Sequence, residues 1–275
     1  MIKILFVGDI VGKPGRKITQ QSIPRLIELH RIDLVIANVE NAAGGNGITR
    51  ETAEELLDAD INVMTTGNHV WDKKEALEYI ELERRLIRPA NFPDGVPGRG
   101  SYVTQTTNGT PVGIVNVMGR VFMNPLDNPF HVVQREISAV RDKGARLVLV
   151  DFHAEATSEK IAMGWHLDGK VTAVVGTHTH VQTADARILH KGTAYITDVG
   201  MTGPHDSIIG VAIQPVLKRF IDGMPVRFET ASKNSRINAV IVTADAETGR
   251  AESIESLNLS AEDIENFNQM SESIQ

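Results

Sequence analysis

The chain of 275 residues has no cysteine, few aromatic residues and no apolar run long enough to cross a membrane. Without cysteine there are no disulfides, thiolate ligands, iron–sulfur clusters or cysteine nucleophile. The formal net charge of −7 argues against a broad surface for duplex nucleic acid. It does not exclude a small phosphate ester, because bound cations reverse the charge of a site locally.

The first residues lead directly into a predicted strand and lack the layout of a signal peptide. We therefore expect a cytoplasmic protein without a membrane partner. The length suits one large domain with a substantial core. We predict a single domain over residues 1–260 and a polar, acidic tail over residues 261–275.

Five short apolar runs end close to side chains that can bind a metal. The runs start at Ile4, Leu34, Ile61, Leu147 and Val171, and their composition predicts buried strands. In open α/β sheets, ligands bind outside the carboxyl ends of the strands. We therefore expect the polar residues to meet on one rim of one sheet, in sufficient number for two ions. They are Asp9, Glu40, Asn41, Asn68, His69, His153, His178 and His180.

Helical patterns separate these runs, which predicts parallel strands joined by right-handed crossovers. Pro24 lies inside the first helical stretch, so we expect a late helix start or a kink there. Further helices are expected over 49–59, with Thr49 as N-cap, and over 72–85 and 130–142.

From residue 102 onward, the sequence predicts mainly strands. The dipeptide Asn108-Gly109 predicts a hairpin turn between strands at 102–104 and 112–117. Alternating patterns beyond His180 predict antiparallel strands in a second sheet that packs on the first. These later strands are expected at 194–197, 225–229 and 238–242.

The stretches 67–69 and 177–180 are the most specific pair of motifs. An amide oxygen and imidazoles together suit Mn, Fe or Zn. Each element alone has a plainer interpretation: Asp9 caps a turn, Glu40-Asn41 is a solvated loop, and one His-x-His is weak evidence. Their combination at five strand ends favours metal binding.

Five stretches of the chain resemble the calcineurin-like metallophosphoesterases, and the resemblance covers nearly its whole length. It is closest to the YmdB-type bacterial branch, described as 2′,3′-cyclic-nucleotide phosphodiesterases. The superfamily usually opens with Asp-x-His and has Gly-Asp at the second strand, whereas this chain has Val11 and Glu40-Asn41 there. These departures point to the YmdB-type branch. The matching stretches are 7–12, 38–45, 66–71, 151–155 and 176–181.

The resemblance implies an α/β metallophosphoesterase-type sandwich of two mixed β-sheets flanked by helices. It implies two metal ions, Fe or Mn before Zn or Mg. Asp9 and His180 would hold one ion and Glu40 would bridge both. The ligands completing the second ion would be Asn41, Asn68, His153 and His178.

The implied activity is that of a hydrolase, a dinuclear metal-dependent phosphodiesterase acting on small nucleotides, with 2′,3′-cyclic nucleotides favoured. A metal-bridging hydroxide would attack in line, with His69 as general acid. Asp151 and Glu155 are expected to have supporting roles, and Trp71 is expected to pack.

Three other functions stay open. A phosphomonoesterase or protein phosphatase would use the same site. A regulatory protein would hold its metal structurally and show little turnover. A metal-dependent amidohydrolase fits less well, because that barrel family carries His-x-His on its first strand, whereas His178 and His180 lie past the midpoint. A homo-oligomer is also compatible with the sequence.

Overall fold

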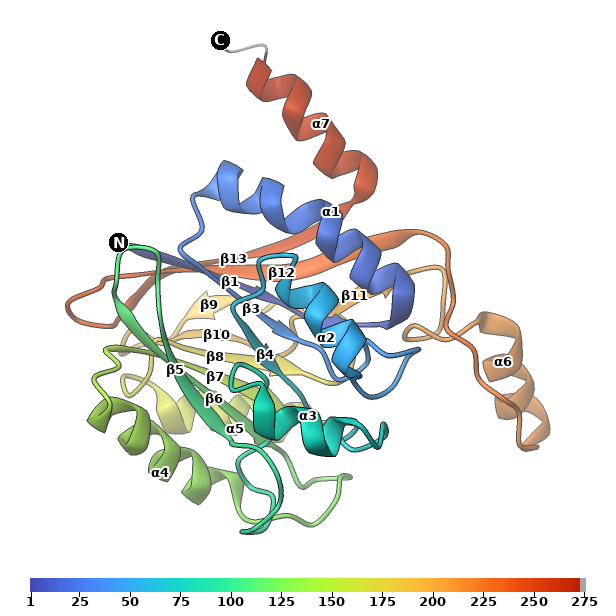
Figure 1. The fold of residues 1–275 in the computed structure, drawn as a ribbon, viewed down its shortest axis with the longest axis horizontal. Helices are drawn as coiled ribbons and strands as arrows, with labels where there is room; N and C mark the ends of the chain where they lie inside the picture. The colour runs from blue at the N-terminus through green and yellow to red at the C-terminus, as the bar shows by residue number, and fades with distance from the viewer. Residues whose placement is uncertain (273–275) are drawn as a thin grey trace.

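A computed structural model describes residues 1–272 as two stacked β-sheets with helices on both outer faces (Figure 1). The first sheet contains β1 (Ile2–Val7), β2 (Asp9–Ile10), β3 (Leu34–Asn38), β4 (Val63–Thr65), β11 (Met201–Pro204), β12 (Ser235–Ala244) and β13 (Ala251–Ser260). The second contains β5 (Ser101–Gln105), β6 (Pro111–Met118), β7 (Leu147–His153), β8 (Ala173–Thr177), β9 (Arg187–Ile188) and β10 (Ala194–Ile196). The helices are α1 (Gly12–His30), α2 (Arg50–Leu57), α3 (Ala76–Leu82), α4 (Pro129–Asp142), α5 (Thr157–Leu167), α6 (Ile213–Asp222) and α7 (Ala261–Glu272).

Both sheets mix parallel and antiparallel pairs. The strand order is β2-β11-β12-β1-β3-β4 in the first sheet, with β13 paired to β12, and β5-β6-β7-β8-β10-β9 in the second. In the first sheet β1 is parallel to β3 and antiparallel to β12. In the second, β7 is parallel to both β6 and β8. The predicted sandwich of two mixed sheets is confirmed.

Strand alternation builds three apolar layers. In β1, Ile4 and Phe6 point into the core between the sheets, where they join Leu149 of β7. The intervening Leu5 points outward and joins the core formed with α1, α2 and α3. On the other outer face, α4 and α5 pack on the second sheet. Because β1 is covered on both faces, it is apolar without interruption from Ile4 to Val7, as its sequence predicts.

Most of the predicted helices and the hairpin are confirmed. Thr49 caps α2 through a reciprocal hydrogen-bond pair with Thr52. The hairpin strands β5 and β6 pair in antiparallel fashion. The helix predicted over 130–142 begins one residue earlier, at Pro129.

The helix α1 begins at Gly12 and runs through Pro24, so the late start is excluded, and the alternative, a kink at Pro24, stays a prediction. Two other local predictions are wrong. Helix α3 begins at Ala76 and not at residue 72, since the chain ahead of it forms turns and the Asp72 carboxylate bonds to Asn46 and His69. The strand expected over 225–229 is irregular.

The five strands that precede the predicted metal ligands were expected to form one sheet, and this prediction is also wrong. Strands β1, β3 and β4 belong to the first sheet, whereas β7 and β8 belong to the second. The later strands do not form a sheet of their own: β10 pairs with β8, and β12 pairs with β1. An apolar run shows that a strand is buried, but not which strand it pairs with. The candidate site therefore lies between the rims of two sheets.

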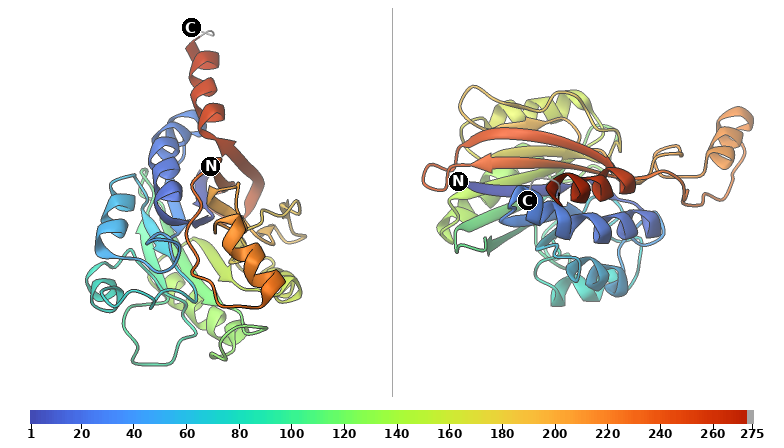
Figure 2. Two further views of the ribbon diagram at one scale, coloured as in Figure 1. Left: turned by 90° about the vertical axis from the view of Figure 1, so that its right-hand side faces the viewer. Right: turned by 90° about the horizontal axis from the view of Figure 1, so that it is seen from above.

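Two elements extend from this body. Helix α6 projects from one end, and α7 leaves the end of β13 (Figure 2). Helix α7 begins where the polar tail was predicted to begin; the division at residue 260 stays a prediction. Over residues 1–272, none of the helices combines the length and apolar character needed to cross a membrane.

Candidate metal centre

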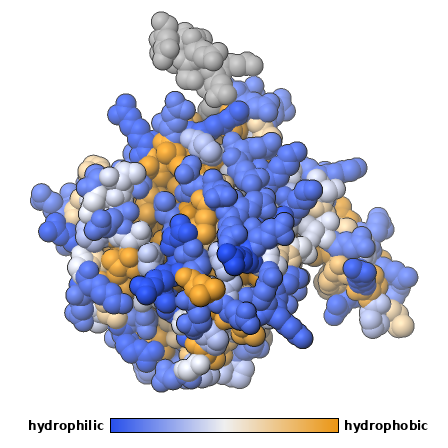
Figure 3. Space-filling view, in the orientation of Figure 1, coloured by the Kyte–Doolittle hydropathy of each residue, from blue (hydrophilic) through white to orange (hydrophobic). Residues whose placement is uncertain are grey.

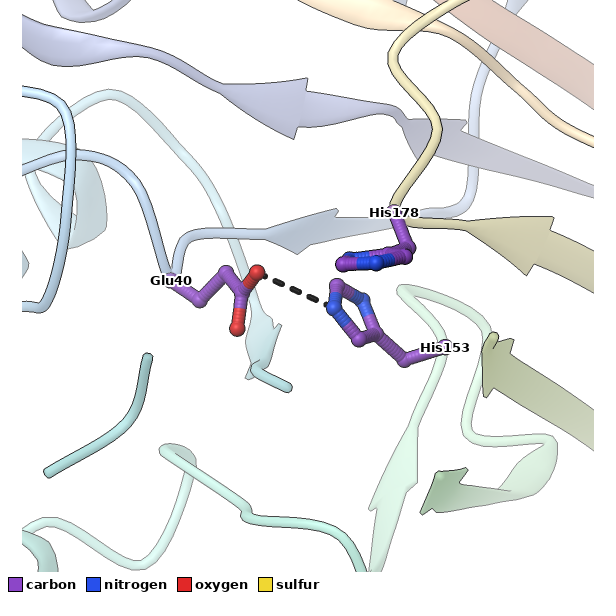
Figure 4. A group of neighbouring side chains, drawn as sticks. All are labelled: Glu40, His153 and His178. Carbon is purple, nitrogen blue, oxygen red and sulfur yellow. Dashed lines mark ion pairs between the residues drawn. The ribbon is translucent and has the colours of Figure 1, made fainter. Parts of the chain in front are cut away.

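Side chains from both sheets converge at the carboxyl ends of their strands. Glu40 follows β3 of the first sheet, His153 ends β7, and His178 follows β8 of the second. One potential ligand atom from each lies within 4.8 Å of the others (Figure 4). Glu40 Oε1 is 3.0 Å from His153 Nε2. The sequence prediction that these strand ends meet is therefore correct, although the strands come from two sheets.

The other predicted ligands lie beside this group in space or next to it in the chain. Asn68 Oδ1 is 3.0 Å from His153 Nε2. Asp9 Oδ1 is 4.0 Å from His153 Nδ1 and 3.8 Å from His180 Nε2. Asn41 is buried next to Glu40 in the chain, and its Nδ2 donates to the carbonyl of Gly45.

Three buried oxygens of this cluster have no hydrogen-bond donor. Among the side chains of residues 1–266, the buried atoms without a hydrogen-bond partner are Asp9 Oδ1, Glu40 Oε1, Asn41 Oδ1 and Asn238 Oδ1. An unpaired buried polar group costs about 1–3 kcal/mol, so native proteins rarely keep several together. Three of the four belong to residues predicted as ligands. The donor set therefore fits a cation that these oxygens would share.

The tautomer of His153 strengthens this fit. The Thr177 hydroxyl donates its proton to Asp151 at 2.7 Å. Its Oγ1 therefore has no proton left for His153 and accepts the hydrogen bond from His153 Nδ1 at 2.9 Å. In neutral His153 the unprotonated nitrogen is then Nε2, which faces the oxygens of Glu40 and Asn68. These lone pairs would repel one another unless a proton or a cation lies between them.

In the metal-free cluster a proton on His153 Nε2 takes this place and pairs with Glu40. Burial opposes the charged forms of both Glu40 and His153, but their mutual attraction outweighs it. The pKa of Glu40 is lowered to about 2 and the pKa of His153 is raised to about 9. Burial raises the pKa of Asp9, against the attraction of His180 and His153. Burial lowers the pKa of His178 to about 3, which keeps this imidazole neutral and able to bind metal.

The turn carrying His178 and His180 has an unusual backbone. Both residues adopt positive φ angles, 99° and 65°. Side chains two residues apart point to the same face of a strand, but β8 ends at Thr177, so His178 and His180 lie in the turn beyond it. The left-handed conformation at both residues, and no longer the strand pleat, sets where the two imidazoles of this His-x-His motif point. Such conformations cost about 1–3 kcal/mol and persist where the surroundings enforce them.

A buried ion pair enforces this turn. Asp198 Oδ2 accepts from the Thr179 amide at 3.1 Å and from its hydroxyl at 2.6 Å. Lys160 from α5 lies 2.6 Å from the same oxygen, and both charged side chains are buried. The motifs in the sequence did not predict this pair. Asp198 follows the carboxyl end of β10, so the strand-end rule that found the other residues would also have found it.

Gly67 packs directly against His153 of the second sheet. A Cβ atom at this position would lie 2.2 Å from His153 Cδ2 and 2.3 Å from its Nε2. No side chain fits there without displacing the imidazole. The glycine in the motif Gly67-Asn68-His69 is therefore required by packing against the opposite sheet.

Asp151 has the supporting role that was expected, because it accepts hydrogen bonds from residues that contact the site. Its carboxylate accepts from Asn38 Nδ2 at 3.1 Å as well as from Thr177 and Thr65. Burial raises its pKa to about 6. Glu155, by contrast, is half exposed and reaches the cluster directly, with Oε2 3.1 Å from His178 Nε2.

His69 has a different environment from the predicted ligands. Its amide donates to Glu40 Oε2 at 2.9 Å, and its ring Nδ1 lies 2.8 Å from Asp72 Oδ2. Asp72 also accepts from Asn46 in the glycine-rich loop. With Nδ1 engaged, Nε2 of this partly exposed ring is the nitrogen left to face a substrate. Trp71 packs edge-to-face on Phe92, which confirms its predicted packing role.

Comparison with known proteins identifies the family. A family model described as YmdB-like protein matches residues 5–257. The chain belongs to the YmdB-like family. Its relatives include a 2′,3′-cyclic-nucleotide 2′-phosphodiesterase of Bacillus subtilis, 48% identical over 255 residues that cover 92% of this chain and 96% of the relative. A protein of Mycoplasma genitalium, named as a candidate phosphatase/phosphodiesterase, is 38% identical over 95% of this chain and 94% of its own.

Solved structures extend the comparison. A hypothetical protein from Thermus thermophilus aligns with a TM-score of 0.88 and 42% identity, over 94% of this YmdB-like chain and 99% of its own. A phosphatase from Mycoplasma pneumoniae aligns with a TM-score of 0.88 and 37% identity, over 94% and 93%. A 5′-nucleotidase precursor from Thermus thermophilus, 15% identical with a TM-score of 0.56, shares the fold alone. The predicted family is thus confirmed, and its metallophosphoesterase fold implies divalent metal ions.

Proposed function

We propose that this YmdB-like protein is a dinuclear metal-dependent phosphodiesterase that hydrolyses small 2′,3′-cyclic nucleotides. The observation that carries the proposal is the set of unpaired buried oxygens on Asp9, Glu40 and Asn41, which meets three histidines between the sheet rims. The activity named for the Bacillus subtilis relative supports the reaction class and the substrate.

We assign the ligands as the family resemblance suggests. Asp9 and His180 would hold one ion, and Glu40 would be shared by both. The second ion would be completed by Asn41, Asn68, His153 and His178. Three imidazoles are poor partners for a hard cation such as Mg²⁺, so Fe or Mn is expected. When bound, two such ions supply Lewis acidity and a water of lowered pKa.

The remaining steps belong to side chains of the protein. The proposed ligands include only two carboxylates, Asp9 and Glu40, so the loaded site stays net positive and attracts a phosphodiester anion. His69, oriented by Asp72 through Nδ1, would donate a proton from Nε2 to the departing ribose oxygen. Its amide hydrogen bond to Glu40 fixes the position of this acid relative to the proposed bridge.

The deciding experiment joins metal analysis of the purified protein to turnover of 2′,3′-cAMP, 3′,5′-cAMP and a phosphomonoester. We expect two metals per chain and preferred hydrolysis of the 2′,3′-cyclic substrate. Preference for the monoester would favour a phosphomonoesterase. Bound metal without turnover of any of the three would favour a regulatory protein, and less than one metal per chain after metal-replete expression would contradict the dinuclear site.

A further inference from the structure

A hollow lined by basic side chains lies at the amino ends of β7 and β8, whereas the candidate metal centre lies at their carboxyl ends. It has a volume of about 210 Å³, and its walls are the end of α4, the loops before β7 and β8, and the turns that join β9 to β10 and β12 to β13. The turn between β12 and β13 is at the left-hand end of the body in Figure 1, and Figure 3 shows hydrophilic residues along that edge. The cationic residues of this basic hollow are Arg141, Arg146, Lys170, Lys191 and Arg250.

The length of two strands separates the basic hollow from the metal centre. Arg146 directly precedes β7, and His153 is the last residue of that strand. A strand rises about 3.3 Å per residue, so the two ends of β7 are roughly 20 Å apart. In the same way, Thr172 lines the hollow just before β8, and His178 follows that strand. A group bound in the hollow is therefore too far from the proposed ions to be the ester that they hydrolyse.

The charge of the lining is entirely positive. All five cationic side chains are exposed, and the ion pairs of Lys and Arg among the described side chains all involve other residues. Two carboxylates of the same loops are turned toward backbone amides: Asp168 accepts from the Lys191 amide at 3.0 Å, and Asp245 accepts from the Thr248 amide at 2.6 Å. In a chain with a net charge of −7, five like charges around one hollow indicate attraction for an anion.

The loops that carry these cations are packed against one another. A Cβ atom on Gly169 would lie 2.7 Å from Lys191 Cβ, so the backbone of one loop contacts the side chain of the next. A Cβ atom on Gly192 would likewise lie 3.3 Å from Arg250 Cγ. The amide of Ala251 donates to the Gly192 carbonyl at 2.9 Å and joins the same two turns. The charged groups therefore extend from a fixed framework, which lowers the entropy lost when a ligand binds.

The residue types favour linked phosphate groups over other anions. The planar guanidinium group of arginine forms paired hydrogen bonds with phosphate oxygens, and lysine adds a point charge. One phosphate group carries at most about two negative charges at pH 7, so two or more are needed to match five cations. The described residues place no aromatic side chain in the lining for a nucleobase to stack on. The volume is also below the roughly 300–1,000 Å³ of sites that enclose a whole small molecule.

We propose that the basic hollow binds a chain of two or three phosphate groups. The chain belongs either to an inorganic oligophosphate or to the 5′ end of a nucleotide whose base stays outside the hollow. An RNA backbone is a poorer match, because a groove for a single strand follows the backbone with its cations. Here the five cations surround one hollow.

Calorimetric titration of the metal-loaded protein with methylenediphosphonate tests this site. The carbon bridge of this probe resists hydrolysis. Binding to the double variant Arg146→Gln/Arg250→Gln should be weaker by on the order of 100-fold, because each lost charge-assisted contact costs about tenfold or more. The matched control, Lys143→Gln/Arg84→Gln, removes the same charge from exposed positions outside the hollow and should bind the probe like the wild type.

The same comparison separates the hollow from the metal ions, which also attract the probe. A binding event shared by all three proteins belongs to the metal centre, and the event in the hollow is the one that the double variant loses. Unchanged metal content and an unchanged melting temperature without ligand show that this variant is folded; otherwise Lys170→Gln/Lys191→Gln replaces it. Equal affinity of the wild type and the folded double variant, or equal weakening in the control, would overturn the proposal.

Further ligands define the chemical class. Inorganic triphosphate and adenosine 5′-(β,γ-methylene)triphosphate should bind the hollow with similar affinity, because they present chains of the same length. Orthophosphate should bind at least about tenfold more weakly, since it contacts fewer of the cations. Equal affinity for orthophosphate, or binding of the nucleotide or of oligouridylate without binding of inorganic triphosphate, would overturn a site for phosphate chains. None of these measurements uses turnover, so they are independent of the substrate assigned above.

Discussion

The two sheets contribute different chemistry to the candidate metal centre. The first supplies oxygen donors, three of them on buried atoms without hydrogen bonds, and the second supplies imidazole nitrogens. The oxygen half of the candidate centre consists of Asp9, Glu40, Asn41 and Asn68, and the nitrogen half consists of His153, His178 and His180. Asp151 and Asp198 hold the nitrogen half in place through buried polar networks.

This difference shows what the centre requires of the fold. Neither rim alone offers both kinds of ligand, so the site is complete only when the apolar core between the sheets is packed. The nitrogen half is already oriented without metal, whereas the oxygen half keeps unpaired acceptors that gain most from a cation. Changes in the two halves should therefore have different effects.

The largest effect is expected in the oxygen half. Glu40→Ala should remove activity and metal content together, because two cations without their shared carboxylate repel at close range. Metal analysis and turnover on the same preparation measure both. Glu54→Ala, which removes a half-exposed carboxylate of α2 that pairs with Arg50, is the control and should keep its metal. Normal loading and turnover of Glu40→Ala would exclude Glu40 from the site.

His69→Ala should separate catalysis from metal binding. We expect intact metal content and a fall in kcat on nucleotide esters of roughly 10²–10⁴-fold, the usual contribution of general acid–base catalysis. An activated ester such as bis-p-nitrophenyl phosphate should slow less, because its leaving group needs little protonation. Loss of metal would make His69 a ligand or its support. Equal slowing of both substrates would indicate that His69 positions the phosphate.

Gly67→Ala tests the contact between the halves. The added methyl must displace the His153 ring, and a shift of about 1 Å in a catalytic group can cost about 10²-fold in rate. We expect a loss of that order, with weaker metal binding. Gly113→Ala is the matched control: its methyl would crowd Val140 on the outer face of the second sheet, so stability should fall without loss of metal. Equal metal loading in both variants would count against the His153 assignment.

The sequence predicted which side chains meet better than how their strands are arranged. Short runs ending in Asp9, Glu40 or His153 identify strand ends, because burial and the rim position of polar residues are local properties. Sheet membership depends on pairing across long stretches of chain, which no run encodes. The strand β13 was missed because only its Ala251 and Leu257 are buried, so its pattern is largely polar.

A smaller effect is expected from the support of the nitrogen half. Thr179→Val removes the hydroxyl that bonds Asp198 but keeps the shape of the side chain. Loss of such an outer contact typically lowers metal affinity about 10–100-fold, and chelator competition would measure it. Thr179→Ser should restore the affinity. An unchanged affinity in Thr179→Val would show that the backbone amide alone holds the turn.

The smallest effect concerns the metal-free protein. The folded-state pKa of His153 is raised to about 9, above its unfolded value of about 6.5, so its stabilisation is complete below that value and is lost as pH rises through 9. Over this window Glu40, with its pKa lowered to about 2, stays ionised in both states. His178, with its pKa lowered to about 3, is neutral when folded and mostly neutral when unfolded. The melting temperature of the chelated protein should therefore fall by a few degrees between about pH 7 and 9.5.

The metal-loaded protein should show the opposite trend over the lower part of this range. Metal binding to His153 displaces the proton that Glu40 otherwise stabilises, so metal affinity and stability rise with pH. Glu40→Gln removes the partner carboxylate and should flatten the fall in the chelated protein. A chelated wild type whose melting temperature is constant or rises over the same range, measured beside that variant, would show that no proton is shared between the oxygen half and the nitrogen half.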